Sequence, residues 1–371
     1  MDGTCSALIT GAGIAGLTAA SALARRGWRV EVIEAGGEAA TTGWGLSLTG
    51  PSLRALDALG LADRCLARGY GMSVITNVDL EGAETTIGLP RLIGRDRPAM
   101  AGIARPELHR ILRAEALRLG VRIHYGLSVS RLLPGNGGAQ AELTDSTTRT
   151  ADLLVGADGI RSTVRDLLGR SAPIRYHGQM VWRALVPRPG WATGIHTFAG
   201  SRHQTGVVPI SASRAYVFLT ENGVRPDVLP DAVLAPRMAE LLAPFTGRVA
   251  EIRPHVARSG SIVRRPVQTA FVDAPWSDGP SVLIGDAAHA PSPQLASGAA
   301  LAIEDGVILA EELDRRQDIR KALEAFVDRR RERCELLVET SVTIAALEQA
   351  QRHRDAYPLI EACHRRMARP A

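Results

Sequence analysis

Apolar and polar residues follow two different periods in the N-terminal part of the chain. Residues 7–10 form a short apolar run, a glycine turn follows, and residues 17–26 carry apolar side chains at helical spacing. Residues 28–34, WRVEVIE, return to the alternation of a strand, and a helix is expected near 51–59. The order strand, glycine turn, helix and strand is typical of a nucleotide-binding α/β fold.

The pattern changes twice further along the chain. Strands are expected within 72–90, at 122–125 and just before Asp158, and helices at 105–120 and 161–168. Between 171 and 278 prolines and β-rich runs such as MVWRALVP and RAYVFLT dominate, with one helix near 230–243. A buried strand ending at Gly285 and a helix opening near Ser297 then restore the first pattern, and a helical tail at 319–353 closes the chain.

These elements predict an α/β protein of two parts. A Rossmann-like domain with a C-terminal helical segment is expected from residues 1–70, 99–170 and 279–371. Residues 71–98 and 171–278 are expected to form an inserted, mostly antiparallel β domain.

Composition and charge exclude several classes of protein. The formal charge of +5 is carried almost wholly by arginine, and these arginines are scattered, so no nucleic-acid-binding surface is expected. The four cysteines lie far apart and form no C-x-x-C pair, so we expect neither a metal site nor a disulfide framework. No apolar run reaches the roughly 18–20 residues of a membrane span. We therefore expect a soluble cytoplasmic protein, monomeric or homodimeric, with a small-molecule substrate.

The first glycine turn carries the pattern of a dinucleotide site. The segment GAGIAG places Gly11, Gly13 and Gly16 in G-x-G-x-x-G spacing between a strand and a helix. Gly13 lets a pyrophosphate approach the backbone, and the helix N-terminus supplies unpaired N–H groups. Glu34, at the end of the next strand, is placed to bind a free ribose 2′-hydroxyl. These residues leave NAD and FAD open.

Two further motifs decide between the two cofactors. DLLVGADGIRSTVR places Asp158 at a strand end, and SVLIGDAAHAPSP places Gly285 and Asp286 at another. In this order the three motifs closely resemble those of the class A FAD-dependent aromatic monooxygenases, the family of para-hydroxybenzoate hydroxylase and salicylate hydroxylase. The resemblance covers nearly the whole chain and implies an FAD-binding domain with an inserted substrate domain.

The resemblance implies a set of FAD-binding residues spread over the chain. They are Gly11, Gly13, Ile14, Ala15, Gly16, Glu34, Ala35, Gly45, Leu46, Arg105, Asp158, Gly285, Asp286, Pro293, Gly298, Ala299 and Ala300. Asp286 would bind the ribityl chain, and Pro293 would lie beside the isoalloxazine. The helix that opens at Gly298 would bring N–H groups to the flavin N1–C2=O edge, which becomes negative on reduction. Relatives commonly carry Gly-Gln before this glycine, whereas this chain has Ala296 and Ser297.

The resemblance also implies the chemistry. NADPH or NADH would reduce FAD, O2 would add at C4a, and the hydroperoxyflavin would insert one oxygen atom into a small aromatic or polycyclic electron-rich substrate. A same-fold epoxidase, Baeyer–Villiger oxygenase or reductase is the alternative enzyme, and a non-catalytic FAD-binding protein is the alternative outside catalysis. No metal is required.

The substrate pocket is less well defined by the sequence. Gln179, Arg183, His196 and Tyr216 are candidates for its lining because they lie on predicted strands of the inserted domain. No catalytic base is singled out. His289 is expected to form a hydrogen bond within its own loop.

Overall fold

The computed structural model describes residues 4–38, 44–134, 137–273 and 275–371. A six-stranded sheet forms one half of the molecule, and its neighbouring strands are parallel except at the β18 edge. In spatial order it contains β18 (Ser277–Asp278), β19 (Ser281–Leu283), β12 (Leu153–Gly156), β1 (Ser6–Thr10), β2 (Arg29–Glu34) and β8 (Arg122–Tyr125). Parallel strands place their carboxyl ends, and the loops that follow them, at one edge of the sheet.

An eight-stranded sheet forms the other half and is antiparallel except between β14 and β5. Its order is β20 (His289–Ala290), β17 (Ile262–Phe271), β13 (Arg175–Pro187), β16 (Arg214–Asn222), β15 (Gln204–Pro209), β14 (Ile195–Ala199), β5 (Val74–Val78) and β6 (Glu84–Gly88). The predicted α/β fold with a mostly antiparallel β-rich part is confirmed. The boundaries between the two domains stay a prediction.

Two three-stranded sheets complete the β-structure among the described residues. One contains β11 (Thr148–Ala151), β10 (Ala139–Leu143) and β9 (Val129–Leu133), which the sequence pattern did not indicate. The other contains β3 (Gly45–Leu48), β7 (Met100–Ala104) and β4 (Tyr70–Met72). Strand β3 brings the predicted flavin-side residues Gly45 and Leu46 against β7, and an added Cβ on Gly45 would lie 2.4 Å from the ring of Tyr216.

The helices differ from the expected ones mainly in the C-terminal half. Those of the first half are α1 (Ile14–Ala24), α2 (Gly50–Ala58), α3 (Ala62–Arg68), α4 (Arg105–Arg118) and α5 (Thr163–Leu167). The later ones are α6 (Asp231–Leu241), α7 (Arg248–Ala257), α8 (Gly298–Arg315), α9 (Ile319–Gln349) and α10 (His353–Met367), with short 3-10 helices η1 (Gly285–Ala287) and η2 (Pro293–Leu295).

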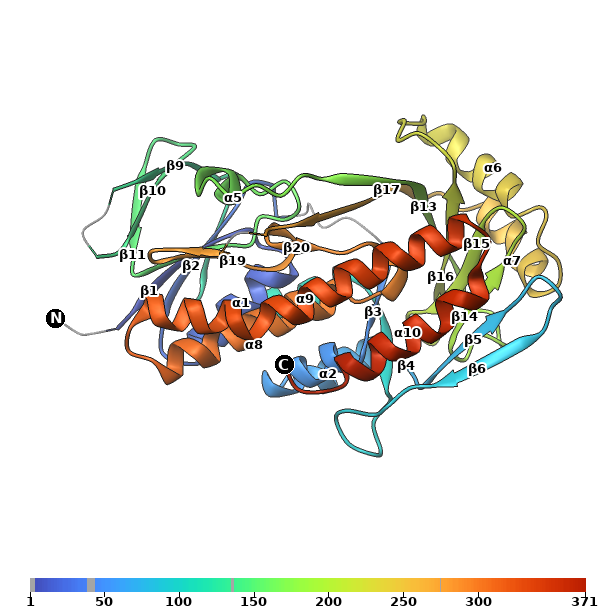
Figure 1. Ribbon diagram of the computed structural model, residues 1–371, viewed down its shortest axis with the longest axis horizontal. Coiled ribbons are helices and arrows are strands. Elements are labelled where there is room, and N and C mark those ends of the chain that lie inside the picture. Colours follow the sequence, from blue (N-terminus) through green and yellow to red (C-terminus); the bar gives the residue numbers. More distant parts are fainter. Residues whose placement is uncertain (1–3, 39–43, 135–136, 274) are drawn as a thin grey trace.

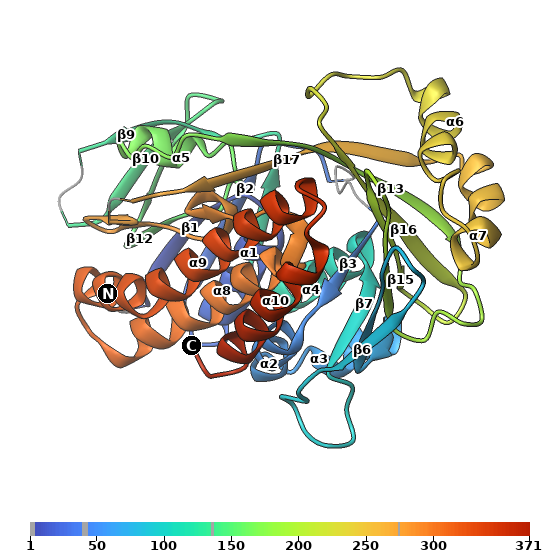
Figure 2. The ribbon, with the colours of Figure 1, turned by 45° about the vertical axis from the view of Figure 1, so that its right-hand side comes forward.

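Two of the later helices, α7 and α10, were not expected from the sequence. The single helix near 230–243 is followed by a second one, α7, which Gly247 introduces in a left-handed conformation with a φ of 55°. The helical tail expected at 319–353 corresponds to α9, and a further helix, α10, follows because the chain turns at Gln351, where φ is 60°. The separate helix α10 packs back along α9 (Figure 2).

The two large sheets lie side by side along the long axis of the molecule, and α9 runs from one half toward the other (Figure 1). One hydrophobic core lies between the six-stranded sheet and helices that include α1, α4 and α8. A second core lies between one face of the eight-stranded sheet and α6 and α7. The opposite face of the eight-stranded sheet is thereby left to line a cavity. Among the described residues no helix is both long and apolar enough to cross a membrane.

Helices α1 and α8 pack unusually close together. An added Cβ at Gly306 of α8 would lie 2.6 Å from the backbone nitrogen of Ala19 in α1, so only glycine fits at this crossing. Such close approach fixes the positions of both helices relative to each other. Their N-terminal ends open onto the same cavity.

Candidate active site

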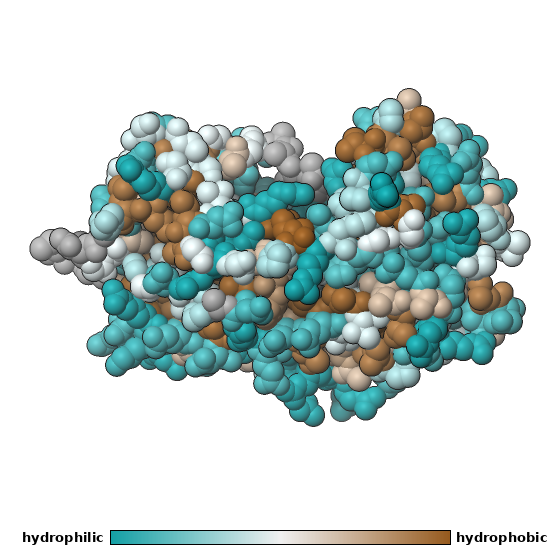
Figure 3. Space-filling model, turned by 45° about the horizontal axis from the view of Figure 1, so that its top comes forward, coloured by the Kyte–Doolittle hydropathy of each residue, from teal (hydrophilic) through white to brown (hydrophobic). Residues whose placement is uncertain are grey.

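A cavity of about 1110 Å³ joins the two halves of the molecule. This volume exceeds the roughly 300–1,000 Å³ of ordinary small-molecule pockets, which suits a large cofactor together with a second molecule. In the space-filling view the outline is notched between the two halves, and hydrophobic side chains gather there among hydrophilic ones (Figure 3).

Most of the predicted cofactor residues line this cavity. They are Gly13, Ile14, Ala15, Gly45, Leu46, Arg105, Asp286, Pro293, Gly298 and Ala299. The structure therefore brings together residues from α1, β3, α4, η1, η2 and α8 that are far apart in the sequence.

The other predicted cofactor residues lie behind this lining. Gly11 turns the chain with a φ of 95°, and an added Cβ on Gly16 would lie 1.9 Å from the Gly11 carbonyl oxygen. Glu34 accepts hydrogen bonds from the backbone N–H groups of Ala12 (2.8 Å) and Gly36 (2.7 Å), so it also holds the glycine turn in place.

Four further residues complete this outer set. Asp158 accepts hydrogen bonds from Ser162 Oγ and the Val164 N–H at the start of α5. Gly285 and Ala300 are buried, whereas Ala35 is exposed.

Two helix N-termini face the cavity without a side-chain cap. Helix α1 begins after Gly13 and α8 after Ser297, and neither has an acidic residue in its first turn. The first N–H groups of such helices are unpaired and carry partial positive charge, which favours anionic ligands. An added Cβ on Gly13 would meet nothing within 4 Å, and one on Gly298 would make only ordinary contacts. Packing alone therefore does not require glycine at either helix start, and both leave room for a ligand to approach the backbone.

Asp286 of η1 is one of the acidic residues that line the cavity. Its side chain is accessible from the cavity although it lies deep within the protein. Burial raises the pKa of its carboxyl, and the charges of His289 and Arg105 oppose that rise. A carboxylate in this position can accept hydrogen bonds from hydroxyl groups. Together with the uncapped helices and open glycines, it fits the phosphates, sugar chain and ring of FAD.

The eight-stranded sheet supplies the opposite wall. Arg183 on β13 and Tyr216 on β16 line the cavity, as the sequence suggested. Burial lowers the pKa of Arg183 and raises that of Tyr216, and Arg183 Nε has no hydrogen-bond partner among the described residues. Gln179 lies just outside the lining, where its Oε1 accepts a hydrogen bond from Gln294.

The placement of His196 in the pocket is wrong. Its neighbours Ile195 and Thr197 line the cavity, so strand alternation turns His196 to the other face of the sheet. There its ring packs edge-on against Trp191 at 5.2 Å, and Nδ1 lies 3.1 Å from the Gly194 carbonyl oxygen.

The sequence reasoning missed the contribution of the C-terminal helices to the cavity. Glu348 of α9 and several residues of α10 line its far end, together with Gln294 of η2. The residues of α10 that do so are His353, Ala356, Tyr357, Ile360, Glu361, His364 and Arg365. In the sequence these residues belong to an arginine- and glutamate-rich helical tail, and nothing in its pattern marks a pocket.

A buried ionic network holds the loop between β19 and α8. Asp305 accepts hydrogen bonds from the Gly285 N–H (2.7 Å) and from Arg330 Nε of α9 (2.8 Å), and His289 Nε2 lies 2.7 Å away. His289 is therefore bonded to α8, and the hydrogen bond expected within its own loop is wrong. Burial alone would raise the pKa of Asp305, but His289 and Arg330 lower it to about 2.

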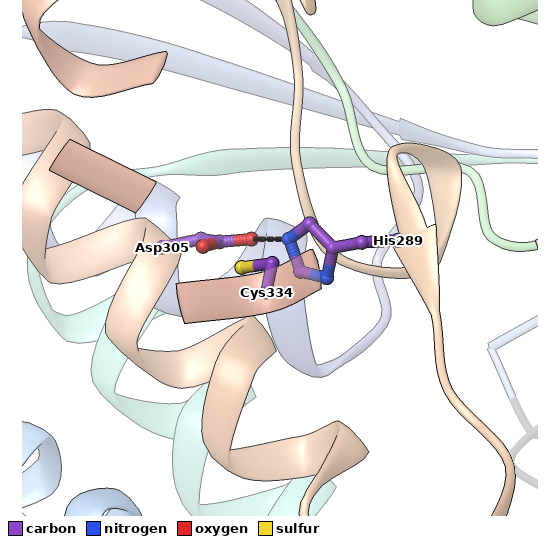
Figure 4. A group of neighbouring side chains, drawn as sticks. All are labelled: His289, Asp305 and Cys334. Atoms are coloured by element: carbon purple, nitrogen blue, oxygen red, sulfur yellow. Dashed lines mark hydrogen bonds and ion pairs between the residues drawn. The ribbon is translucent and has the colours of Figure 1, made fainter. Parts of the chain in front are cut away.

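Cys334 completes a group that has the ligand types of a metal site. Figure 4 shows Cys334, His289 and Asp305 facing one another, and their ligand atoms lie within 4.8 Å of each other. Both Asp305 oxygens already accept hydrogen bonds from protein groups. A metal ion would have to displace these donors, so the geometry favours a structural network.

Comparisons with known proteins agree with this site. A family model described as FAD binding domain matches residues 4–341. The 2-heptyl-3-hydroxy-4(1H)-quinolone synthase of Pseudomonas aeruginosa is 34% identical over 306 residues, which is 82% of this chain and 79% of that protein. The 3-amino-4-hydroxybenzoate 2-monooxygenase of Streptomyces cremeus is 31% identical over 325 residues, 83% of this chain and 78% of that protein.

The solved structures show the same fold. The structure of Klebsiella pneumoniae HpxO complexed with FAD and uric acid superposes with a TM-score of 0.84 at 25% identity, covering 99% of this chain and 94% of that one. The chain belongs to the FAD-binding domain family. Within that family it is a class A FAD-dependent monooxygenase of the aromatic hydroxylase type.

The buried network yields a prediction for stability. The variant Arg330→Met should lower the free energy of unfolding by about 3–5 kcal/mol, because it leaves the Asp305 carboxylate buried with one partner fewer. Arg320→Met, at an exposed position of the same helix, should change it by no more than about 0.5 kcal/mol. Urea denaturation followed by circular dichroism measures both, and equal stability of the two variants would contradict the role given to Arg330.

Proposed function

We propose that the protein uses NADH or NADPH and O2 to insert one oxygen atom into a small, electron-rich aromatic or heteroaromatic ring. The observation that carries this proposal is the single cavity that connects the glycine turn of α1 and the start of α8 with the inner face of the eight-stranded sheet. Such a cavity offers room for FAD along the helices and for a planar ring between the flavin and the sheet.

The residues of the chain have defined tasks in this proposal. The N–H groups at the start of α1 bind the pyrophosphate, and Glu34 binds a ribose hydroxyl. Asp286 binds the ribityl hydroxyls, and the N–H groups at the start of α8 stabilise negative charge on the flavin edge. When bound, FAD would supply the redox chemistry, which is acceptance of a hydride from the nicotinamide and activation of O2 for transfer of one oxygen atom to the ring, with the other leaving as water.

The protein then orients the ring and excludes water. Apolar residues of the eight-stranded sheet, among them Val181, Ile195 and Phe218, line the cavity and cover a planar substrate. Arg183 and Tyr216 lie in the same wall and give it polar groups. Positioning of this kind accounts for a large part of catalysis when the cofactor carries the chemistry.

The relatives narrow the class of substrate. A quinolone is named for the Pseudomonas relative, and uric acid is bound in the Klebsiella structure. Both are planar bicyclic rings that contain nitrogen. We therefore place bicyclic N-heteroaromatic rings first among the substrates to be tested, with phenolic acids second.

The proposed function is tested with the FAD-loaded protein and isotopically heavy O2. NADH or NADPH oxidation should accelerate with 4(1H)-quinolone, uric acid or a phenolic acid, and mass spectrometry should find one heavy oxygen atom in a hydroxylated ring. Heavy oxygen in an epoxide or a lactone would indicate one of the same-fold alternatives. Nicotinamide oxidation that no ring accelerates would contradict a monooxygenase acting on such rings.

A variant tests the role of Asp286. Asp286→Ala should weaken FAD binding about 10- to 100-fold, which corresponds to the roughly 1.5–3 kcal/mol of hydrogen bonds to a charged group. Hydroxylation should fall with it at limiting FAD. Asp328→Ala, which removes an exposed acid on α9, is the matched control and should bind FAD normally. Tight FAD binding with full activity in Asp286→Ala would show that this carboxylate does not hold the cofactor.

A further inference from the structure

A group of buried polar side chains stands at the end of the cavity formed by α9, α10 and η2. Glu348 lies in the last turn of α9, is 7% exposed and lines the cavity. The side-chain amide of Gln294 contacts it: Gln294 Nε2 donates to Glu348 Oε2 at 3.3 Å and to Gln179 Oε1 at 3.1 Å. One amide donor is therefore shared between two acceptors.

This carboxylate is unusual because no cation balances it. Among the described residues no arginine, lysine or histidine forms an ion pair with Glu348, and burial raises the pKa of its carboxyl to about 7. Gln294 and Gln179 oppose this rise only in part. Burying a carboxylate without a cation lowers the stability of the folded protein. Such a carboxylate in the wall of a ligand cavity is therefore a candidate for a functional group.

The surrounding groups also lack partners. Gln294 Oε1 and both ring nitrogens of His353 are buried without hydrogen-bond partners among the described residues. His353 is 6% exposed and lines the same end of the cavity. Buried polar groups in folded proteins are normally satisfied, so three unpaired ones around one carboxylate indicate that a polar ligand completes them.

We propose that the Glu348 carboxylate recognises the substrate by accepting a hydrogen bond from a ring N–H of a neutral, planar heteroaromatic molecule. This inference rests on the proposed function and specifies the substrate of that same cavity. Gln294 follows Pro293 in the loop expected beside the flavin ring, so a substrate held by Glu348 and Gln294 lies next to the reacting face. A negatively charged acceptor also disfavours a substrate that carries its own carboxylate at this end.

Other charged and titratable groups line the same cavity. They include Arg183 of β13, Arg265 of β17, and Tyr357, Glu361, His364 and Arg365 of α10. Burial lowers the pKa of His353 and of His364 below the usual histidine value, whereas it raises that of Glu348 to about 7, so both imidazoles titrate on the acid side of Glu348. The pH dependence described below is therefore assigned to Glu348.

The test measures binding to the oxidised, FAD-loaded protein, so it requires no turnover. The probes are 4(1H)-quinolone and its N-methyl derivative, which lacks the donor, and binding is followed by the change in flavin absorbance. The wild type should bind the N–H ring about 10- to 100-fold more tightly at pH 8, since the acceptor is charged there. This preference should decrease at pH 6 as the carboxylate takes up a proton.

The variant Glu348→Gln keeps the shape but removes the charge. Its preference for the N–H ring should be smaller and independent of pH, whereas Glu339→Gln, an exposed substitution on the same helix, should behave as the wild type. An unchanged, pH-dependent preference in Glu348→Gln would overturn the proposal, as would equal or absent binding of both rings by the wild type. The proposal would also be overturned if the protein preferred para-cresol to its methyl ether but did not prefer the N–H ring to its N-methyl derivative. That result would indicate that Glu348 accepts a hydrogen bond from an O–H donor.

Thermal unfolding checks the buried acid without any ligand. The pKa of Glu348 is raised in the folded state, so its protonated form stabilises the fold at low pH, and this contribution is lost as the pH rises through about 7. The melting temperature of the wild type should fall more between pH 5 and pH 8 than that of Glu348→Gln. If the melting temperatures of the wild type and Glu348→Gln depended on pH in the same way, the claim that Glu348 is buried without a cation would be contradicted. Failure of the proposed function would appear separately, as nicotinamide oxidation that no ring accelerates in the wild type.

Discussion

The geometry of the site depends on the hydrogen bonds that the buried carboxylate of Asp305 accepts. This carboxylate joins the backbone of η1, the imidazole of His289 and the guanidinium of Arg330, and so connects the β19–α8 loop with α8 and α9. All three side chains are buried, where charged hydrogen bonds are strong and an unpaired charge is costly. The loop that carries Asp286 and Pro293 is thereby held against the start of α8.

A second constraint acts on the helices themselves. Gly306 allows α8 to approach α1 so closely that any side chain there would clash with backbone atoms. Both helices begin at the cavity, and neither has a side-chain cap on the N–H groups at its start. A single packing contact therefore positions both helix starts, which we propose to bind the pyrophosphate and the flavin ring. The wall proposed for the substrate is supplied separately, by the inner face of the eight-stranded sheet.

The sequence predicted the parts of this site that depend on local backbone geometry. Glycine spacing and acids at strand ends mark turns that the chain forms from its own neighbours, so Gly13 and Asp286 could be placed before any fold was known. Faces of strands could not be placed so well, because a shift of one residue exchanges the two sides, as His196 shows. The role of Glu348 could not be predicted, because an acid in a helix rich in glutamate and arginine is expected to be exposed to solvent. Only the packing of α10 and η2 against it makes it part of the cavity.

The most direct test of the whole account is the visible spectrum of the purified protein, recorded anaerobically before and after NADH or NADPH is added, with and without a heteroaromatic ring. The account predicts the absorption bands of bound flavin, which the nicotinamide bleaches faster when the ring is present. A protein that shows no flavin bands even after incubation with FAD would contradict the cofactor site described for α1 and α8, and the function proposed from it.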